Sequence, residues 1–200
     1  MLNSFKNNTP PMVLNLLIIN CLGLMAGTLF PILDFKLGLH TLQSVYFAPY
    51  QVISYMFLHA SMQHLFFNMF ALWMFGRTLE YELGSQRFLT YYLVCGIGAA
   101  LLQLAVGTIF PFSLTVGASG AVFGLLLAFG VMHPNATIML LIPPIPMKAK
   151  WFVILYGALE LILGLRNSAT DNIAHFAHLG GMIWGLLLLL YWRRNGKIYF

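Results

Sequence analysis

Long, mostly apolar runs recur along this chain, and each is about long enough to cross the roughly 30 Å hydrocarbon core of a bilayer as a helix. The runs cover approximately residues 12–32, 55–76, 88–109, 117–133, 151–166 and 173–192. Helices are expected because a helix satisfies its own backbone hydrogen bonds in lipid, and because the runs are too long for barrel strands. The pattern therefore predicts an all-α, polytopic membrane protein with six transmembrane helices.

The composition supports a membrane protein. Hydrophobic residues make up 60% of the chain and charged residues 8%, which leaves too few polar side chains to cover a soluble globule. Neither a soluble domain nor an internal repeat is evident, so we expect one transmembrane domain over residues 1–200. The first run is expected to stay in place, because Leu24 is a poor residue at position minus three of a signal-peptide cleavage site after Ala26.

Basic residues gather on one side of the six predicted spans. On that side lie Lys6, Arg77, Arg87, Lys148, Lys150, Arg193, Arg194 and Lys197, whereas Lys36 and Arg166 lie on the other. The positive-inside rule then places both termini in the cytoplasm. The segment 33–54 becomes an outside loop.

Three predicted spans that run inward bring a polar side chain to one depth. His64, Ser119 and His178 lie 13, 14 and 15 residues before the inner ends of their spans, which is roughly 20 to 22 Å above the inner face. Asn68 lies one turn below His64 on the same helical face. A charged side chain at mid-bilayer costs about 2.5 to 3.5 kcal/mol, so this gathering of polar groups needs a reason.

Nucleophilic catalysis is one such reason. A serine hydroxyl becomes a good nucleophile when a base, usually imidazole, removes its proton. In "GASGAVFG" Gly117 lets a loop enter the protein, and Ser119 begins a short helix whose free N–H groups can stabilise an oxyanion. We expect His178 to be the base, and Phe123, on the same helical face as Ser119, to hold its ring by packing.

Paired glycines occur in the fourth and sixth spans. Gly120 and Gly124 are four residues apart in one span, and Gly181 and Gly185 are four apart in the other. Such G-x-x-x-G pairs let helix backbones approach closely. We therefore expect these two spans to pack tightly and to bring the serine and the histidine together.

No carboxylate is expected at the level of His178, so the sequence predicts a Ser119–His178 dyad and not a triad. Glu160, in the fifth span, lies roughly 9 Å below Arg166, and we assign it a structural role. His175, about 4.5 Å above His178, is the alternative base.

Taken in order, these motifs resemble those of the rhomboid intramembrane serine proteases. The motifs are GASG at the start of a short helix, H-x4-H-x3-N at His59, His64 and Asn68, and AH-x2-G-x3-G at His178, Gly181 and Gly185. The segments "LEYELGSQRF" and "PPIPMKAKW" also look like loops of bacterial members. The resemblance covers about residues 50–192. A Trp-Arg pair that the family often carries in its first outer loop is missing.

The resemblance implies a six-helix fold, with both termini inside, that cleaves transmembrane segments of other proteins in a bacterial inner membrane. No cofactor, metal ion or nucleic acid is expected. Ser119 would be the nucleophile and His178 the base, with His64, Asn68 and the Ser119 N–H at the oxyanion. His59 is expected to be structural, tethering a loop by a hydrogen bond.

Two other classes stay open. An inactive relative could bind and escort membrane clients, although retention of both Ser119 and His178 speaks against it. A small transporter could use the intramembrane histidines and Glu160 to relay protons, although inverted repeats are not evident. The substrate, the oligomeric state and the gating element cannot be inferred from these residues.

Overall fold

The computed structural model describes residues 9–110, 114–139, 144–166 and 174–200. Its elements, in chain order, are α2 (Pro11–Leu29), α3 (Ile32–Leu37), α4 (Gln51–Ser54), the 3₁₀ helix η1 (Tyr55–Phe57), α5 (Met62–Leu83), α6 (Ser85–Val106), α7 (Ser119–Met132), β1 (Thr137–Met139), β2 (Pro146–Lys148), α8 (Ala149–Arg166) and α9 (His175–Arg194). β1 and β2 form a short antiparallel hairpin in which Ile138 pairs with Met147. The described chain is otherwise helical or irregular, as the apolar runs predict.

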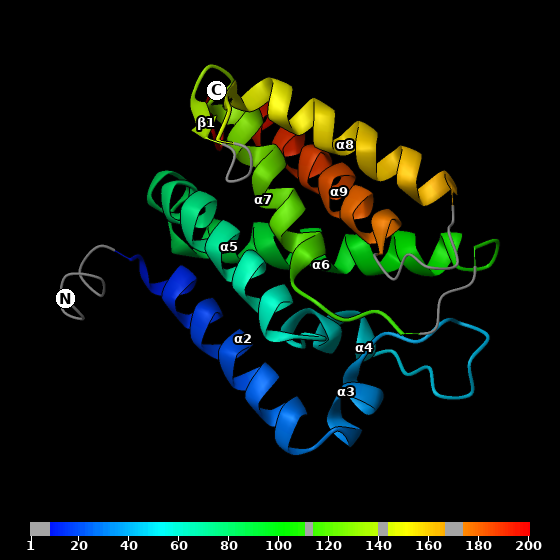
Figure 1. Cartoon of the computed structure of the whole chain (residues 1–200). Coiled ribbons are helices and arrows are strands. Elements are labelled where there is room, and N and C mark those ends of the chain that lie inside the picture. The colour runs from blue at the N-terminus through cyan, green and yellow to red at the C-terminus, as the bar shows by residue number, and fades with distance from the viewer. Residues whose placement is uncertain (1–8, 111–113, 140–143, 167–173) are drawn as a thin grey trace.

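The short helix α7 lies at the centre of the molecule. Figure 1 shows it between α5, α6 and α9, with α8 (yellow) along α9 on one side and α2 (blue) along α5 on the other. Every face of α7 is therefore covered by protein, which suits a helix that begins inside the molecule. Its end at Met132, before His133 and Pro134, agrees with the expected effect of a proline on the preceding residue.

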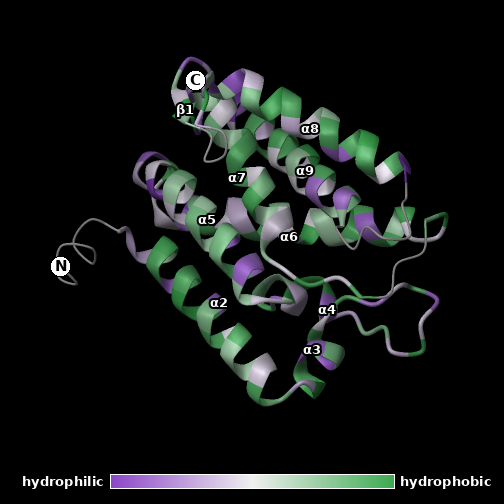
Figure 2. Cartoon of the chain, viewed as in Figure 1, coloured by the Kyte–Doolittle hydropathy of each residue, from purple (hydrophilic) through white to green (hydrophobic). Residues whose placement is uncertain are grey.

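Three helices in the described part of the chain are long and apolar enough to cross a bilayer, namely α2, α6 and α9. The helix α7 is apolar but shorter. Figure 2 shows apolar residues along the whole length of α2 and α8, and many of their large side chains are exposed, for example Ile18, Leu22, Ile154 and Leu165. Such continuous exposed apolar surface is typical of lipid contact. Six spans with both termini inside stay a prediction.

The second predicted span differs from the structure at its outer end. Instead of one helix from residue 55, the chain forms η1, leaves the helical path, and begins α5 at Met62. Ser61 caps α5, because its hydroxyl oxygen accepts a hydrogen bond from the His64 N–H at 3.1 Å. His59 therefore lies before the helix and His64 lies in its first turn.

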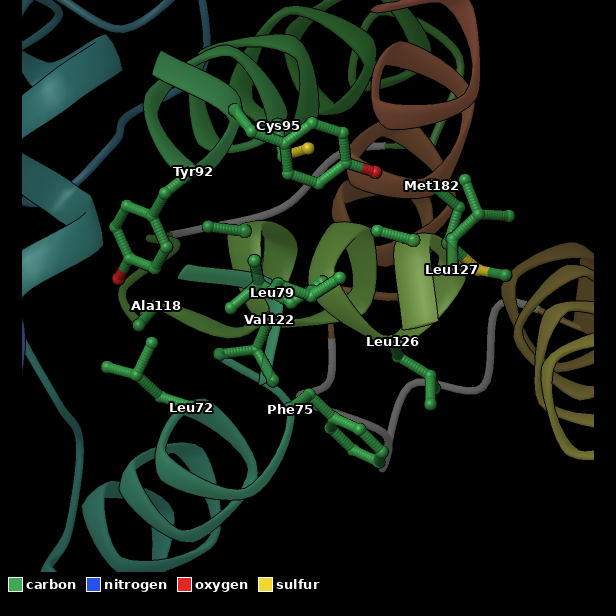
Figure 3. Close-up of a cluster of buried hydrophobic side chains, with 14 of the residues drawn as sticks. Leu72, Phe75, Leu79, Tyr92, Cys95, Ala118, Val122, Leu126, Leu127 and Met182 are labelled. Atoms are coloured by element: carbon green, nitrogen blue, oxygen red, sulfur yellow. The ribbon is translucent and has the colours of Figure 1, made fainter. Parts of the chain in front are cut away.

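Apolar side chains of α5, α6 and α9 pack around those of α7. Figure 3 shows this core, to which α5 contributes Leu72, Phe75 and Leu79, α6 contributes Tyr92 and Cys95, α7 contributes Val122, Leu126 and Leu127, and α9 contributes Met182. Lipid tails are as apolar as leucine, so burial from lipid adds little driving force between helices. Close packing and interhelical hydrogen bonds must therefore hold this core together.

Small residues let α7 and α9 touch, as predicted. A Cβ atom on Gly181 would collide with the carbonyl group of Gly120, and one on Gly124 would lie 3.1 Å from the Gly181 carbonyl oxygen. Gly185, however, faces α6, where a Cβ would meet Tyr91 and Cys95. Of the two glycines in the α9 motif, Gly181 thus allows contact with α7 and Gly185 allows contact with α6.

A buried carboxylate fastens α2 to α5. The Glu80 oxygens accept hydrogen bonds from the backbone N–H groups of Met12 and Val13 at 2.9 and 2.7 Å, and from the Ser85 hydroxyl at 2.6 Å. The first N–H groups of a helix have no acceptor within it, and a negative charge there is favourable. Glu80, a residue of α5, therefore supplies the hydrogen-bond acceptors that the first N–H groups of α2 lack within their own helix.

The predicted outside loop, residues 33–54, is an organised segment. The buried Gln51 side chain accepts from two backbone N–H groups and donates to two carbonyls, those of His40, Ala48, Lys36 and Tyr46. Leu39 and Thr115 exchange a pair of backbone hydrogen bonds of 2.9 Å. The segment is thus tied to the stretch of chain just before α7, without a Trp-Arg pair.

The Gly120–Gly181 contact gives a first prediction. Gly181→Ala should destabilise the protein by about 1–3 kcal/mol, because the added methyl meets backbone, which cannot move aside. Gly157→Ala is the matched control, since its Cβ would lie 3.2 Å from the flexible end of Met182. Thermal unfolding in detergent should show a lower midpoint for Gly181→Ala alone. Equal midpoints for the two variants would contradict the packing described here.

Candidate active site

The loop that delivers Ser119 is fixed by Tyr55 and shaped by Gly117. The Gly117 N–H donates to the Tyr55 carbonyl oxygen at 2.9 Å, and the Tyr55 hydroxyl donates to the Gly96 carbonyl oxygen at 2.7 Å. Gly117 has a φ of 129°, which residues with a side chain rarely adopt. A Cβ there would also lie 2.7 Å from Cε1 of the His64 ring. Both the backbone and the available space therefore require glycine at this position.

Ser119 and His178 meet at the centre of the molecule. α7 begins at Ser119, as predicted, and the Ser119 Oγ lies 2.7 Å from the His178 Nε2. The imidazole is buried, with 7% of the residue exposed. The two residues come from α7 and α9, which the glycine contacts hold together. The pair has the geometry of a nucleophile and its general base.

Phe123 covers one face of the His178 ring. The two rings are stacked, with centroids 4.2 Å apart and planes 7° from parallel. Because Phe123 lies one turn after Ser119 on α7, the helix that carries the hydroxyl also fixes the plane of the imidazole. This is the packing that the sequence predicts.

The expectation that no carboxylate reaches His178 is wrong. Oε2 of Glu160 lies 2.9 Å from Nδ1 of His178 and 2.6 Å from Nδ1 of His175. The sequence did contain a sign of this contact. Glu160 lies roughly 9 Å below Arg166, which is about the depth of His178 below the outer face. Depth alone does not say which way a side chain points, and α8 turns Glu160 toward α9.

His175 and His178 share the face of α9 that meets this carboxylate. They are three residues apart and therefore neighbours on the helix surface. Their ring centroids are 6.4 Å apart and their planes are nearly perpendicular, at 86°. The hydroxyl of Ser119 is paired with His178 and not with the alternative base His175.

His64 lies beside the loop that carries Ser119, and Asn68 lies one turn after His64 on α5. The His64 ring packs against Gly117, as the close approach to a Cβ at that glycine indicates, and the same Cβ would lie 3.8 Å from the Ser119 Oγ. Asn68 is buried, and its Nδ2 has no hydrogen-bond partner among the described residues. An unpartnered buried donor costs about 1–3 kcal/mol and calls for an explanation.

Among the described residues, His59 makes no hydrogen bond of the kind expected to tether a loop. Both of its ring nitrogens are buried without a hydrogen-bond partner in the part of the chain that the structure describes. Its ring instead packs edge-on against His64, with centroids 5.1 Å apart. The contact of His59 that the described structure shows is thus ring packing on His64.

A cavity of about 430 Å³ opens beside Phe123. α5, α7, α8 and β1 line it mainly with apolar side chains, among them Phe67, Phe70, Met74, Phe123, Phe152 and Tyr156, together with Asn68. Phe123 also stacks on the His178 ring, so the cavity adjoins the histidine of the pair. Sequence reasoning missed it, because apolar residues that line a cavity look the same as those that face lipid.

Glu160, His175 and His178 also have the composition of a metal site. One ligand atom from each lies within 4.8 Å of the others, and histidine with carboxylate suits Zn²⁺. The same three groups are already partners of one another at hydrogen-bond distance. Their clustering therefore does not require an ion.

The fold and the site together define a helical membrane protein in which an inner helix presents a serine to a histidine of its neighbour. The Rhomboid domain model matches residues 46–195. The chain therefore belongs to the rhomboid family.

Several relatives share this region. The chain is 35% identical over 141 residues to "Rhomboid protein 1, mitochondrial" of Saccharomyces cerevisiae, covering 68% of this chain and 40% of the yeast protein. It is 32% identical over 132 residues to "Rhomboid protease GluP" of Bacillus subtilis, covering 64% of this chain and 23% of that protein. "RHOMBOID-like protein 6, mitochondrial" of Arabidopsis thaliana is 32% identical over 140 residues, which is 70% of this chain and 42% of the relative. The chain thus spans less than half the length of each of these proteins.

The stacking of Phe123 gives a second prediction. Phe123→Leu should lower the rate at which Ser119 reacts with a fluorophosphonate by about two- to tenfold, since an aromatic pair contributes about 0.5–1.5 kcal/mol. Phe129→Leu is the matched control on the same helix, because Phe129 packs on Phe75 and not on His178. A rate for Phe123→Leu equal to that of the control would mean that the ring does not help to hold the histidine.

Proposed function

We propose that this chain is a serine endopeptidase that cleaves transmembrane segments of other membrane proteins. Ser119 is the nucleophile and His178 is the general base. The observation that carries the proposal is the 2.7 Å separation between the Ser119 Oγ and the His178 Nε2. Membership of the rhomboid family, among whose members is a named protease, supports the same reaction class.

In the proposed reaction the Ser119 hydroxyl gives its proton to Nε2 of His178 as Oγ bonds to the carbonyl carbon of the substrate. The carbonyl oxygen becomes an oxyanion, which the Ser119 N–H, His64 and Asn68 stabilise. His178 then passes its proton to the leaving amine, and the peptide bond breaks to leave an ester on Ser119. A water molecule, deprotonated by the same histidine, hydrolyses the ester and restores the enzyme.

The surroundings of the serine favour this arrangement for an oxyanion. The first N–H groups of α7 have no carbonyl within the helix to bind, and the Nδ2 group of Asn68 is an unpartnered donor. A donor that is unsatisfied at rest gains its partner when the oxyanion forms. Stabilisation that appears only in the transition state is what accelerates a reaction.

The substrate proposed from the cavity is an apolar segment of a membrane protein. The apolar walls beside Asn68 and Phe123 suit aliphatic side chains that flank the bond to be cleaved. The family resemblance suggests a small residue before that bond and helix-breaking residues after it. A bacterial inner membrane is our prediction for the location, whereas two of the relatives are described as mitochondrial.

An inactive protein that binds membrane clients would use the same cavity without chemistry. The two functions differ in whether Ser119 is reactive. Wild-type protein in detergent should be labelled by a fluorophosphonate and should cleave a transmembrane peptide in liposomes. Absence of both reactions in folded protein would favour the client-binding function.

The proposed roles give a third prediction. Ser119→Ala and His178→Ala should each abolish labelling and cleavage, because the first removes the attacking oxygen and the second removes the base. Ser44→Ala, in the outer segment, is the control and should behave as wild type. Thermal unfolding of each variant shows whether it is folded. Cleavage by purified Ser119→Ala at the wild-type rate would refute the assignment.

Asn68 gives a fourth prediction. Asn68→Leu should slow cleavage by about 10²- to 10³-fold, the usual loss for one oxyanion donor. Its unfolding midpoint should be equal to or above that of wild type, because the substitution removes an unsatisfied buried donor. Loss of stability together with an unchanged cleavage rate would assign Asn68 to the fold and not to the reaction.

A further inference from the structure

We propose that Glu160 completes a serine–histidine–glutamate triad, as a positioning residue that holds His178 in its reactive tautomer and stabilises its protonated form. His175 holds the carboxylate in place. This inference rests on the proposed function of Ser119 and His178. It extends the predicted dyad to four residues in contact. These are Ser119 on α7, His178 on α9, Glu160 on α8 and His175, which is again on α9.

The first argument concerns which ring nitrogen carries the proton. Oε2 of Glu160 contacts Nδ1 of both histidines, at 2.9 Å and 2.6 Å. An ionised carboxylate only accepts hydrogen bonds, so it satisfies both contacts when each Nδ1 carries a hydrogen. The Nε2 of neutral His178 is then a lone pair. That lone pair faces the Ser119 hydroxyl at 2.7 Å and can take its proton.

The second argument concerns charge. When His178 accepts the serine proton, the ring becomes a cation in a site where His178 is 7% and Glu160 8% exposed. An isolated buried cation is costly. A carboxylate 2.9 Å from Nδ1 offsets this cost, and its effect is larger in this buried site than it would be in water. Phe123 holds the ring plane but supplies no charge.

The third argument concerns how the carboxylate is held. The hydrogen-bond partners of Glu160 in the described structure are the two imidazoles. His175 makes the shorter contact and so fixes Oε2 beside His178. Gly164, one turn after Glu160, lets α8 approach α9 closely, because a Cβ at Gly164 would lie 3.2 Å from the His175 Cβ and from the Phe176 ring. Helix packing and hydrogen bonding thus both place the same oxygen.

A purely structural glutamate would satisfy the same two imidazoles, and the two roles predict opposite orders of variants. Glu160→Gln keeps the shape and loses the charge, whereas Glu160→Asp keeps the charge and shortens the side chain. For a triad, fluorophosphonate labelling should fall by about 10²- to 10⁴-fold in Glu160→Gln and by less in Glu160→Asp. For a structural role, Glu160→Gln should be the milder change, and that order would overturn the proposal.

Glu80→Gln is the matched control, because Glu80 is a second buried glutamate with three hydrogen-bond donors, at the start of α2. It should lower the unfolding midpoint without lowering the labelling rate of the folded fraction. Thermal unfolding measured alongside separates loss of fold from loss of reactivity in every variant.

The wild-type protein provides a test that needs no Glu160 variant. Nitrogen-15 NMR of the His178 ring should show a proton on Nδ1 and none on Nε2 in the resting wild-type protein. A proton on Nε2 in resting wild-type protein would overturn the proposal. The same result holds whether or not the Glu160 variants fold.

Three further outcomes distinguish failure of the triad from failure of the proposed function. If Ser119→Ala and His178→Ala abolish labelling while Glu160→Gln labels within threefold of wild type, the triad is refuted and the proposed function stands. If Ser119→Ala is labelled like wild type, both fail. If a chelator stops labelling of wild type and Zn²⁺ restores it, Glu160, His175 and His178 form a metal site and the triad is refuted.

Discussion

The arrangement of this molecule depends on one constraint, which is that polar groups inside an apolar bundle must find one another. Water is scarce there, and an unpaired buried polar group is costly. Ser119, His178, Glu160 and His175 meet this constraint as one continuous line, with successive contacts of 2.7, 2.9 and 2.6 Å. Each helix that carries one of these residues is thereby fixed in its rotation about its own axis as well as in its position, since turning it would break at least one of the three contacts.

Such a line forms only if helix backbones come close, and small residues provide that closeness. Gly181 lets α9 touch the backbone of α7, while Gly164 lets α9 approach α8. The loop before α7 needs Gly117 for its positive φ and for the space beside His64. Packing in a membrane is driven by contact and not by exclusion of water, so these glycines contribute to function through the distance that they permit.

The sequence was sufficient for the helices, for the start of α7 at Ser119 and for the meeting of Ser119, His178 and Phe123, because apolar length and residue depth along an axis can be counted. It was insufficient wherever the outcome depends on rotation about that axis. Glu160 stands at the right depth, yet only the packing of α8 on α9 turns it toward His178. Likewise Gly185 shares a motif with Gly181 but faces α6, and the break before Met62 follows from a cap that a hydropathy pattern does not show.

The two sides of Ser119 differ in a way that fits a reaction. On the side of His178 each contact is complete at rest, so the base is held before any substrate arrives. On the side of His64, which approaches Gly117, the same helix α5 also carries Asn68, whose buried Nδ2 lacks a partner among the described residues. Preorganised donors that meet their acceptor only as charge develops contribute most to catalysis, because no reorganisation is needed at that moment. A bundle selected for stability alone would carry an apolar side chain at this position, so the proposed oxyanion contact offers a physical reason for the buried asparagine.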